Sequence, residues 1–240
     1  MASGRSRATG SEPDWGSVAR FHRPRRSLGL LLGVGFATAV VVATLALVLR
    51  GGGSFELPSH AVLAGMDVRQ RVVAIANSQV GYRTEPSESY CNKFGAQWDA
   101  GAAGCPNGGR SEEWCADFAA WAWKQAGVHF TYGFGRGEIN AGAASFYEWG
   151  VANDAWHPAT SGYVASPGDV AVYGLSLGSV PSASHVAIVT RDSSGQRGPD
   201  VVNGDGDRTG FSVVETGTDQ VQADVSHAGD SILAGYVSVR

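Results

Sequence analysis

Cysteine is scarce in this chain of 240 residues, and basic residues are scarce beyond its first segment. The three cysteines, Cys91, Cys105 and Cys115, lack the close pairing of zinc sites, and the six histidines are scattered, so we expect no metal and no cofactor. The net charge is −4, but six arginines against two acidic residues give residues 1–26 a net +4, so the remaining 214 residues carry −8. An acidic body without a basic stripe argues against nucleic-acid binding.

Charge is absent altogether from residues 28–49, which read LGLLLGVGFATAVVVATLALVL. As a helix rising 1.5 Å per residue, this run would be about 33 Å long, enough to cross the hydrocarbon core of a bilayer. Basic residues that flank a membrane helix tend to stay in the cytoplasm. Four arginines directly precede this run: Arg20, Arg23, Arg25 and Arg26. We therefore predict a single-pass protein of the cell membrane with a cytoplasmic amino terminus; a cleaved signal peptide is the alternative, and either would export the remaining chain.

The predicted organisation is a disordered basic tail (1–27), a transmembrane helix (28–49), a flexible linker (50–65) and one domain (66–240). An exported domain permits disulfides, and three cysteines leave one unpaired. Cys91 and Cys105 flank a loop rich in glycine and alanine that a disulfide can readily close, which would leave Cys115 as the free thiol. A bond between Cys105 and Cys115 is the alternative.

The stretch SEEWCADFAAWAWKQAG, residues 111–127, predicts a largely buried helix that contains Cys115. Ser111 is a plausible N-cap followed by two glutamates in the first turn, and Gly127 is a plausible end. Backbone N–H groups at a helix start favour the thiolate and lower the pKa of a cysteine there, which suggests a nucleophile. Packing in the core is the alternative interpretation of the same cysteine.

A cysteine nucleophile needs a base, and His185 has the most suitable context. It opens the apolar, β-branched run HVAIVT, which indicates a strand, and the stretch PDVVNGDG (199–206) predicts a second strand after it. If the two strands are antiparallel neighbours, Asn203 or Asp205 comes near His185 and can fix the tautomer of its ring. A tight hairpin turn is the other interpretation of NGDGD, and we interpret His157 and the proline after it as a loop.

Together these stretches resemble the CHAP family, the cysteine- and histidine-dependent amidohydrolases and peptidases of the papain-like superfamily. The resemblance rests on EEWCADFAAWAWKQAG, on SPGDVAVYG followed by SASHVAIVT, and on VVNGDG, with VRQRVVAIANSQVGY and YCNKFG as further typical stretches, and it covers about residues 66–240. It implies that Cys115 is the nucleophile and His185 the general base. Many CHAP domains carry a glutamate and then an asparagine where this chain has Asn203 and Asp205, and either residue is a candidate partner of the histidine.

The resemblance implies an α+β, papain-like fold in which helices of the amino-terminal half pack on an antiparallel sheet. It also implies a peptidoglycan hydrolase, an amidase or endopeptidase that cleaves an amide bond outside the membrane. The alternatives are a non-catalytic CHAP-like binding or scaffold module at the cell envelope, and another papain-like activity such as a transpeptidase or protease. The expected strands are 170–173, 185–190, 201–202, 211–215 and 233–239.

Overall fold

The computed structural model describes residues 55–87, 89–192, 199–206, 212–217 and 232–240. The predicted tail, the predicted membrane helix 28–49 and the first part of the predicted linker lie outside these residues. Among the described residues, no helix has the length and apolar character needed to cross a membrane.

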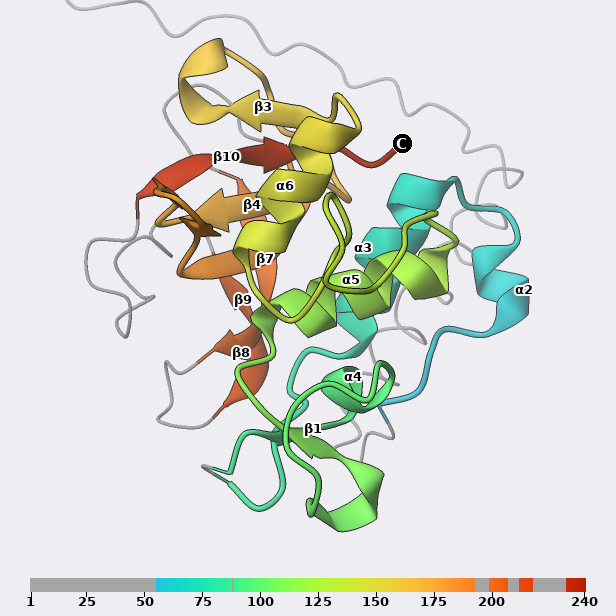
Figure 1. The fold of residues 1–240 in the computed structure, drawn as a ribbon. Helices are drawn as coiled ribbons and strands as arrows, with labels where there is room; N and C mark the ends of the chain where they lie inside the picture. Colours follow the sequence, from blue (N-terminus) through green and yellow to red (C-terminus); the bar gives the residue numbers. More distant parts are fainter. Residues whose placement is uncertain (1–54, 88, 193–198, 207–211, 218–231) are drawn as a thin grey trace, which may run out of the picture. The chain divides into compact units, whose positions relative to one another are not determined.

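A six-stranded antiparallel sheet is the centre of the described domain (Figure 1). Its strand order is β3-β10-β4-β7-β8-β9, so the carboxy-terminal strand β10 lies between β3 and β4 rather than at an edge. The strands are β3 (Trp156–Pro158), β4 (Val170–Tyr173), β7 (His185–Arg191), β8 (Asp200–Gly206), β9 (Val213–Gly217) and β10 (Leu233–Val237). Two-residue strands form two small ribbons: β1 (Cys91–Asn92) with β2 (Arg110–Ser111), and β5 (Ser176–Leu177) with β6 (Pro181–Ser182).

Each of the five predicted strands is present, although some bounds differ. The second strand after His185 is longer than predicted, because β8 continues through the NGDG segment with an irregular register instead of turning there. The interpretation of His157 and Pro158 as a loop is wrong. Both belong to the edge strand β3, where the missing N–H of a proline costs no interior hydrogen bond.

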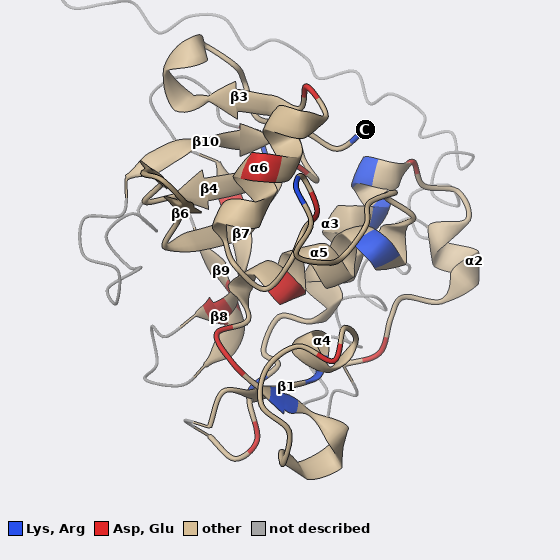
Figure 2. Ribbon diagram, viewed as in Figure 1, with Lys and Arg blue, Asp and Glu red and all other residues tan. Residues whose placement is uncertain are grey.

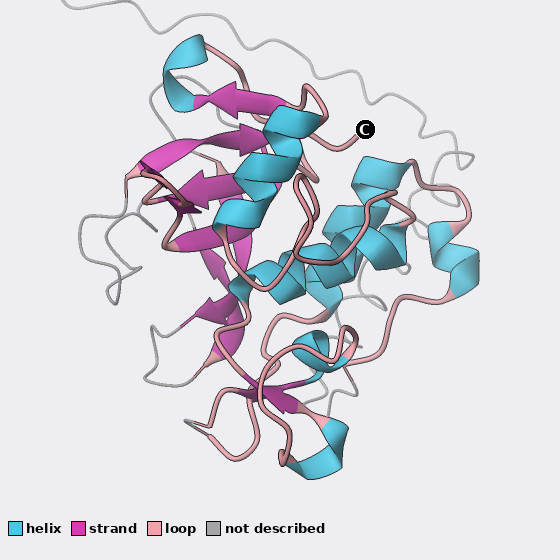
Figure 3. Ribbon diagram, in the orientation of Figure 1, coloured by secondary structure: helices cyan, strands magenta, loops and turns pink. Residues whose placement is uncertain are grey.

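Helices cover one face of the sheet, as the α+β prediction required (Figure 3). The main helices are α3 (Val68–Ser78), α5 (Cys115–Ala126) and α6 (Ala144–Ala152); α2 (His60–Leu63) and α4 (Lys93–Ala96) are single turns, and η1 (Pro106–Gly108) and η2 (Ala159–Ser161) are 3-10 turns. The core between helices and sheet is rich in aromatic side chains, including Phe94, Trp114, Phe118 and Trp123. A second, smaller apolar cluster is formed by other side chains of β4, β7, β8 and β10, including Tyr173 and Val189.

Helix α5 packs against β7 and β8. The sequence predicts its end correctly but not its start. Gly127 ends the helix in a left-handed conformation (φ 89°), as predicted. The predicted start at Ser111 is wrong, because the helix begins at Cys115 with Trp114 as its N-cap residue. Ser111 instead belongs to β2 and donates a hydrogen bond to the carbonyl of Ser89. Pairing with β1 therefore outweighs the local capping preference.

Candidate active site

Cys115 is the first residue of α5, and the end of β8 supplies the cap that the helix needs. The N-cap residue Trp114 has no side-chain acceptor, so its backbone N–H donates to Oδ2 of Asp205 instead, over 3.0 Å. The indole N–H of Trp114 donates to Ser212 Oγ (2.6 Å), and that hydroxyl donates to the other oxygen of Asp205. A carboxylate from a distant strand thus satisfies the start of the helix and compensates its dipole.

Close packing of α5 on β8 fixes the position of this cap. A side chain on Gly204 would place its Cβ 2.4 Å from Cβ of Phe118, so only glycine allows the helix to lie this near the strand. The next residue, Asp205, adopts a positive φ of 60°, which aspartate tolerates better than most residues. The irregular register of β8 between Asn203 and Gly206 therefore directs the Asp205 carboxylate to the amino end of α5.

His185 and Asn203 meet across the neighbouring strands β7 and β8. Asn203 lies opposite Ala187 in the ladder, and its Oδ1 is 3.0 Å from Nε2 of His185. Because an amide oxygen only accepts hydrogen bonds, this contact places a proton on Nε2 in the neutral ring and makes Nδ1 the acceptor. Both side chains are buried, with exposures of 6% for His185 and 4% for Asn203.

The thiol of Cys115 reaches the same end of β7. It accepts hydrogen bonds from the backbone N–H groups of Val186 and Ala116, and Val186 directly follows His185. Cys115 therefore lies beside the backbone of the start of β7, the strand end at which His185 and Asn203 are hydrogen-bonded to each other. Asp205 is anchored at the adjoining helix start by Trp114 and Ser212, where its charge also acts on the thiol.

The predicted lowering of the pKa of Cys115 is wrong for the molecule in this state. The side chain is only 8% exposed, and the pKa of the thiol is raised to about 12: burial is the largest cause, the charges of Asp205 and Asp117 act in the same direction, and the two backbone N–H donors oppose it. Desolvation of a buried anion thus outweighs the helix start. The resting cysteine is a neutral thiol.

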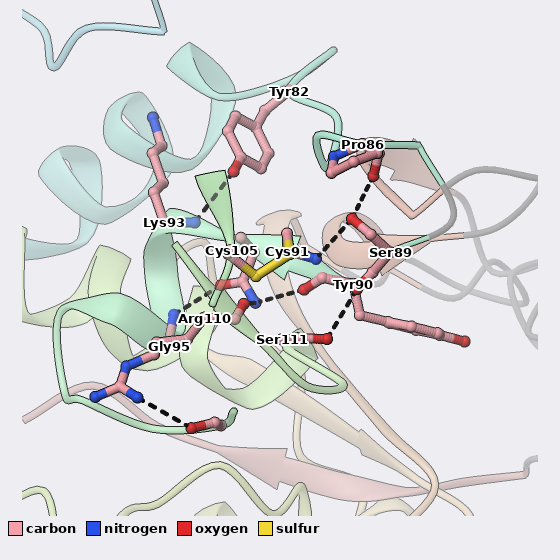
Figure 4. The surroundings of a disulfide bond; sticks show 12 residues. Tyr82, Pro86, Ser89, Tyr90, Cys91, Lys93, Gly95, Cys105, Arg110 and Ser111 are labelled. Atoms are coloured by element: carbon pink, nitrogen blue, oxygen red, sulfur yellow. Dashed lines mark hydrogen bonds between the residues drawn. A yellow bond between two sulfur atoms is a disulfide. The ribbon is translucent and has the colours of Figure 1, made fainter. Parts of the chain in front are cut away.

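A disulfide joins Cys91 at the start of β1 to Cys105 immediately before η1, which leaves Cys115 as the free cysteine (Figure 4). The β1–β2 ribbon beside it is held by the Asn92 side chain, which donates to the carbonyls of Tyr90 and Arg110 and accepts from the N–H of Gly95. This small lobe directly precedes α5 in the chain. It therefore fixes the segment of chain that leads into α5.

The two glutamates before Cys115 are predicted from the sequence only as complements of the helix dipole, and Asp117 is not among the predicted site residues. Asp117, on the first turn of α5, is fully buried and accepts a 2.5 Å hydrogen bond from the Tyr132 hydroxyl. Glu112 lies against it from the segment before the helix. In Figure 2 the first turn of α5 is red, and blue marks basic residues on α3 and at the opposite end of α5. The sequence held one indication of a buried acidic residue, because Asp117 stands within an otherwise apolar stretch of the helix.

A group of at least three histidine, cysteine, aspartate or glutamate side chains able to hold a metal is absent from the described part of the chain. The predicted site residues Cys115, His185 and Asn203 supply a thiol, an imidazole and an amide. Such a set suits nucleophilic attack on an acyl carbon.

This class of site agrees with the family comparison. Residues 106–203 match the CHAP domain family, and the matched range contains Cys115, His185 and Asn203, whereas Asp205 lies just beyond it. The match supports the resemblance to the CHAP domain, whose members are cysteine- and histidine-dependent amidohydrolases or peptidases. Comparison with curated proteins and with solved structures found no match.

Proposed function

We propose that this protein is a peptidoglycan hydrolase that cleaves an amide bond with Cys115 as nucleophile. The observation that supports this most is the hydrogen bond between His185 and Asn203 at the start of β7, next to the Val186 backbone N–H that acts on the Cys115 thiol, within the residues that match the CHAP domain. A CHAP domain is in general associated with hydrolysis of peptidoglycan. The substrate would be an amide of the stem peptide or of a crossbridge.

In the proposed reaction His185 Nδ1 takes the proton of the Cys115 thiol, and the thiolate attacks the substrate carbonyl carbon. Asn203 holds Nε2 and keeps the ring in the tautomer that leaves Nδ1 as acceptor. Backbone N–H groups at the start of α5, including that of Cys115, are the proposed donors to the oxyanion. The imidazolium then protonates the leaving amine, and water hydrolyses the thioester.

The raised pKa of Cys115 constrains this scheme. A raised pKa favours the protonated thiol at neutral pH, so in the proposed scheme the thiolate forms by proton transfer to His185 during the reaction. The charge separation then occurs beside the Val186 and Ala116 N–H groups, which stabilise the anion.

Digestion of purified peptidoglycan with the full chain in detergent tests the proposal. Mass spectrometry of the products should show new amino termini with the native chain and none with Cys115→Ala. A matched control is Cys91→Ser combined with Cys105→Ser, which removes the other two thiols and should retain cleavage at a temperature where the variant is folded. Equal release with Cys115→Ala would refute the proposed nucleophile.

A binding module without catalysis is the second candidate, and the burial and raised pKa of Cys115 favour it. In that case the full chain would sediment with insoluble peptidoglycan but release no fragments, and Cys115→Ala would bind as well as the native chain.

The proposed location is the outer side of the cell membrane, with residues 28–49 as a single-pass anchor and the amino terminus in the cytoplasm. The uncharged run and the arginines before it support this orientation. Membranes washed with alkaline carbonate should retain the full chain. Protease added to intact spheroplasts should remove the domain but spare an amino-terminal tag; release of the domain by the wash would instead indicate a cleaved signal peptide.

A further inference from the structure

Two carboxyl groups beside the nucleophile face each other in the interior. Glu112 lies three residues before Cys115 and Asp117 two residues after it, and their carboxyl groups act on each other. A Cβ built on Gly95 would lie 2.5 Å from Oε1 of Glu112 and 3.2 Å from Oδ2 of Asp117, so these two oxygens border the same point. Tyr132 donates to Oδ1 of Asp117, which leaves Oδ2 for the contact with Glu112. The pair thus joins the segment that leads into α5 to the first turn of the helix.

The facing oxygens lack a donor. Glu112 Oε1 and Asp117 Oδ2 are both buried and, within the described residues, neither receives a hydrogen bond from an N–H or O–H group. Ionised carboxylates only accept hydrogen bonds, so two ionised groups here would repel each other without compensation. One proton between the two oxygens makes the contact a hydrogen bond and satisfies both.

The neighbouring groups do not supply a hydrogen-bond donor to these two oxygens. Arg110 on β2 is the cation that acts on Glu112, but it is ion-paired with Asp99. Tyr132 donates only to the other oxygen of Asp117. Lys93 on α4 donates to the Gln79 side chain and the Phe55 carbonyl, away from the pair.

We propose that Glu112 and Asp117 share one proton, and that this bridged pair is a positioning device for Cys115. The bridge spans residues 112–117, so it holds the turn whose backbone N–H groups surround the nucleophile. Glu112 and Asp117 are positioning residues, because they act through the helix start and do not contact the proposed substrate. Only the consequence for Cys115 rests on the proposed function; the shared proton does not.

The bridge makes the domain sensitive to alkaline pH. Burial, followed by the contact with Asp117, raises the pKa of Glu112 to about 8, and burial raises that of Asp117 as well. A carboxyl whose pKa is higher in the folded state binds more protons folded than unfolded, so stability falls as pH rises from the ordinary carboxyl range towards about 8. Above that pH the bridge is lost.

Infrared spectroscopy of the full chain in detergent detects the bridge directly. At neutral pH the native chain should show the carbonyl band of a protonated carboxyl, and this band should vanish in Glu112→Gln and in Asp117→Asn. Glu113→Gln is the matched control, because Glu113 is exposed and adjacent, and it should keep the band. Absence of the band in the native chain, or its persistence in both variants, would overturn the proposal.

Thermal unfolding and alkylation test the positioning role. Glu112→Gln replaces the shared proton by an amide donor. Between pH 5 and 8 its unfolding temperature should therefore fall much less than that of the native chain. Its Cys115 should react with iodoacetamide at the native rate. Glu112→Ala removes the bridge and should raise that rate about fivefold or more by opening the turn over the thiol. Equal rates in both variants would refute the positioning role.

Calcium distinguishes a proton from a cation. If 1 mM Ca²⁺ stabilises the native chain at pH 8 and Glu112→Gln abolishes that effect, the pair binds a cation and the shared proton is refuted; no effect supports the proton. These readouts require no peptidoglycan cleavage, so they remain valid if the proposed hydrolase activity is absent.

Discussion

Asp205 has two measurable effects of opposite sign, one on the stability of α5 and one on the thiol at its start. Its carboxylate accepts from the Trp114 N–H and from the Ser212 hydroxyl, and its charge raises the pKa of Cys115. Replacing it should therefore weaken the fold and at the same time favour the thiolate. A residue whose main role is to orient the histidine would not produce this combination.

The cost follows from the two hydrogen bonds. Loss of an N-cap acceptor costs about 0.5–2 kcal/mol and loss of a hydrogen bond to a charged group about 1.5–3 kcal/mol, so Asp205→Ala should lower the free energy of unfolding by about 2–5 kcal/mol. Asparagine keeps an acceptor for the Trp114 N–H and tolerates the positive φ at this position. Asp205→Asn should therefore cost only about 1 kcal/mol.

Urea unfolding of the full chain, followed by tryptophan fluorescence, measures the first effect, and the pH dependence of Cys115 alkylation measures the second. In Asp205→Asn the alkylation profile should shift to lower pH, because a negative charge near the thiol is removed. An unchanged free energy of unfolding in Asp205→Ala, or an unchanged or upward-shifted profile in Asp205→Asn, would refute the assignment of Asp205 as the cap of the nucleophile helix.

Three further variants test the packing of α5 on β8, the residue that holds the proposed base, and the disulfide. Gly204→Ala should lower the free energy of unfolding by about 1–3 kcal/mol in urea, because the new Cβ would lie 2.4 Å from that of Phe118. Asn203→Ala should lower kcat for peptidoglycan cleavage by up to about 10²-fold, because the histidine loses the group that holds its ring. Replacing Cys91 and Cys105 by serine should cost about 3 kcal/mol in urea, as expected for a crosslink that spans 14 residues.

Matched controls separate these effects from general disturbance. Gly178→Ala places its Cβ no nearer than 3.6 Å to another atom outside its neighbours, so it should leave the free energy of unfolding within about 0.5 kcal/mol of the native value. Asn203→Asp retains an acceptor for His185 Nε2 and should keep more activity than Asn203→Ala. Equal losses in the two Asn203 variants would contradict the proposed hydrogen bond.

The sequence was sufficient to predict the strands and the neighbours of the histidine, because these depend on short patterns. An apolar run begins at His185, and antiparallel pairing with the next run brings Asn203 beside it. The start of α5 was mispredicted because local preference favoured Ser111 as a cap. The actual cap comes from Asp205, 91 residues away from Trp114, and no local pattern reveals such a partner.

The state of the thiol was mispredicted for a related reason. The position of Cys115 at a helix start is readable from the sequence, but its burial depends on strands that come much later in the chain, and burial has the larger effect on the pKa. The acidic pair was likewise hidden, because Glu112 and Asp117 come together only through a turn whose shape depends on β2 and on Tyr132.

The distance along the chain between Trp114 and Asp205 has a consequence for biosynthesis. A ribosome that has finished α5 has made a cysteine helix whose first turn still lacks its carboxylate, and the sheet beneath it stays open until β10, the last strand made, enters between β3 and β4. Contacts between such remote segments form late in folding. A nascent chain that stops before β8 and β10 would thus carry Cys115 without its completed surroundings, so any reactivity of this thiol that depends on them must wait until those strands have been made.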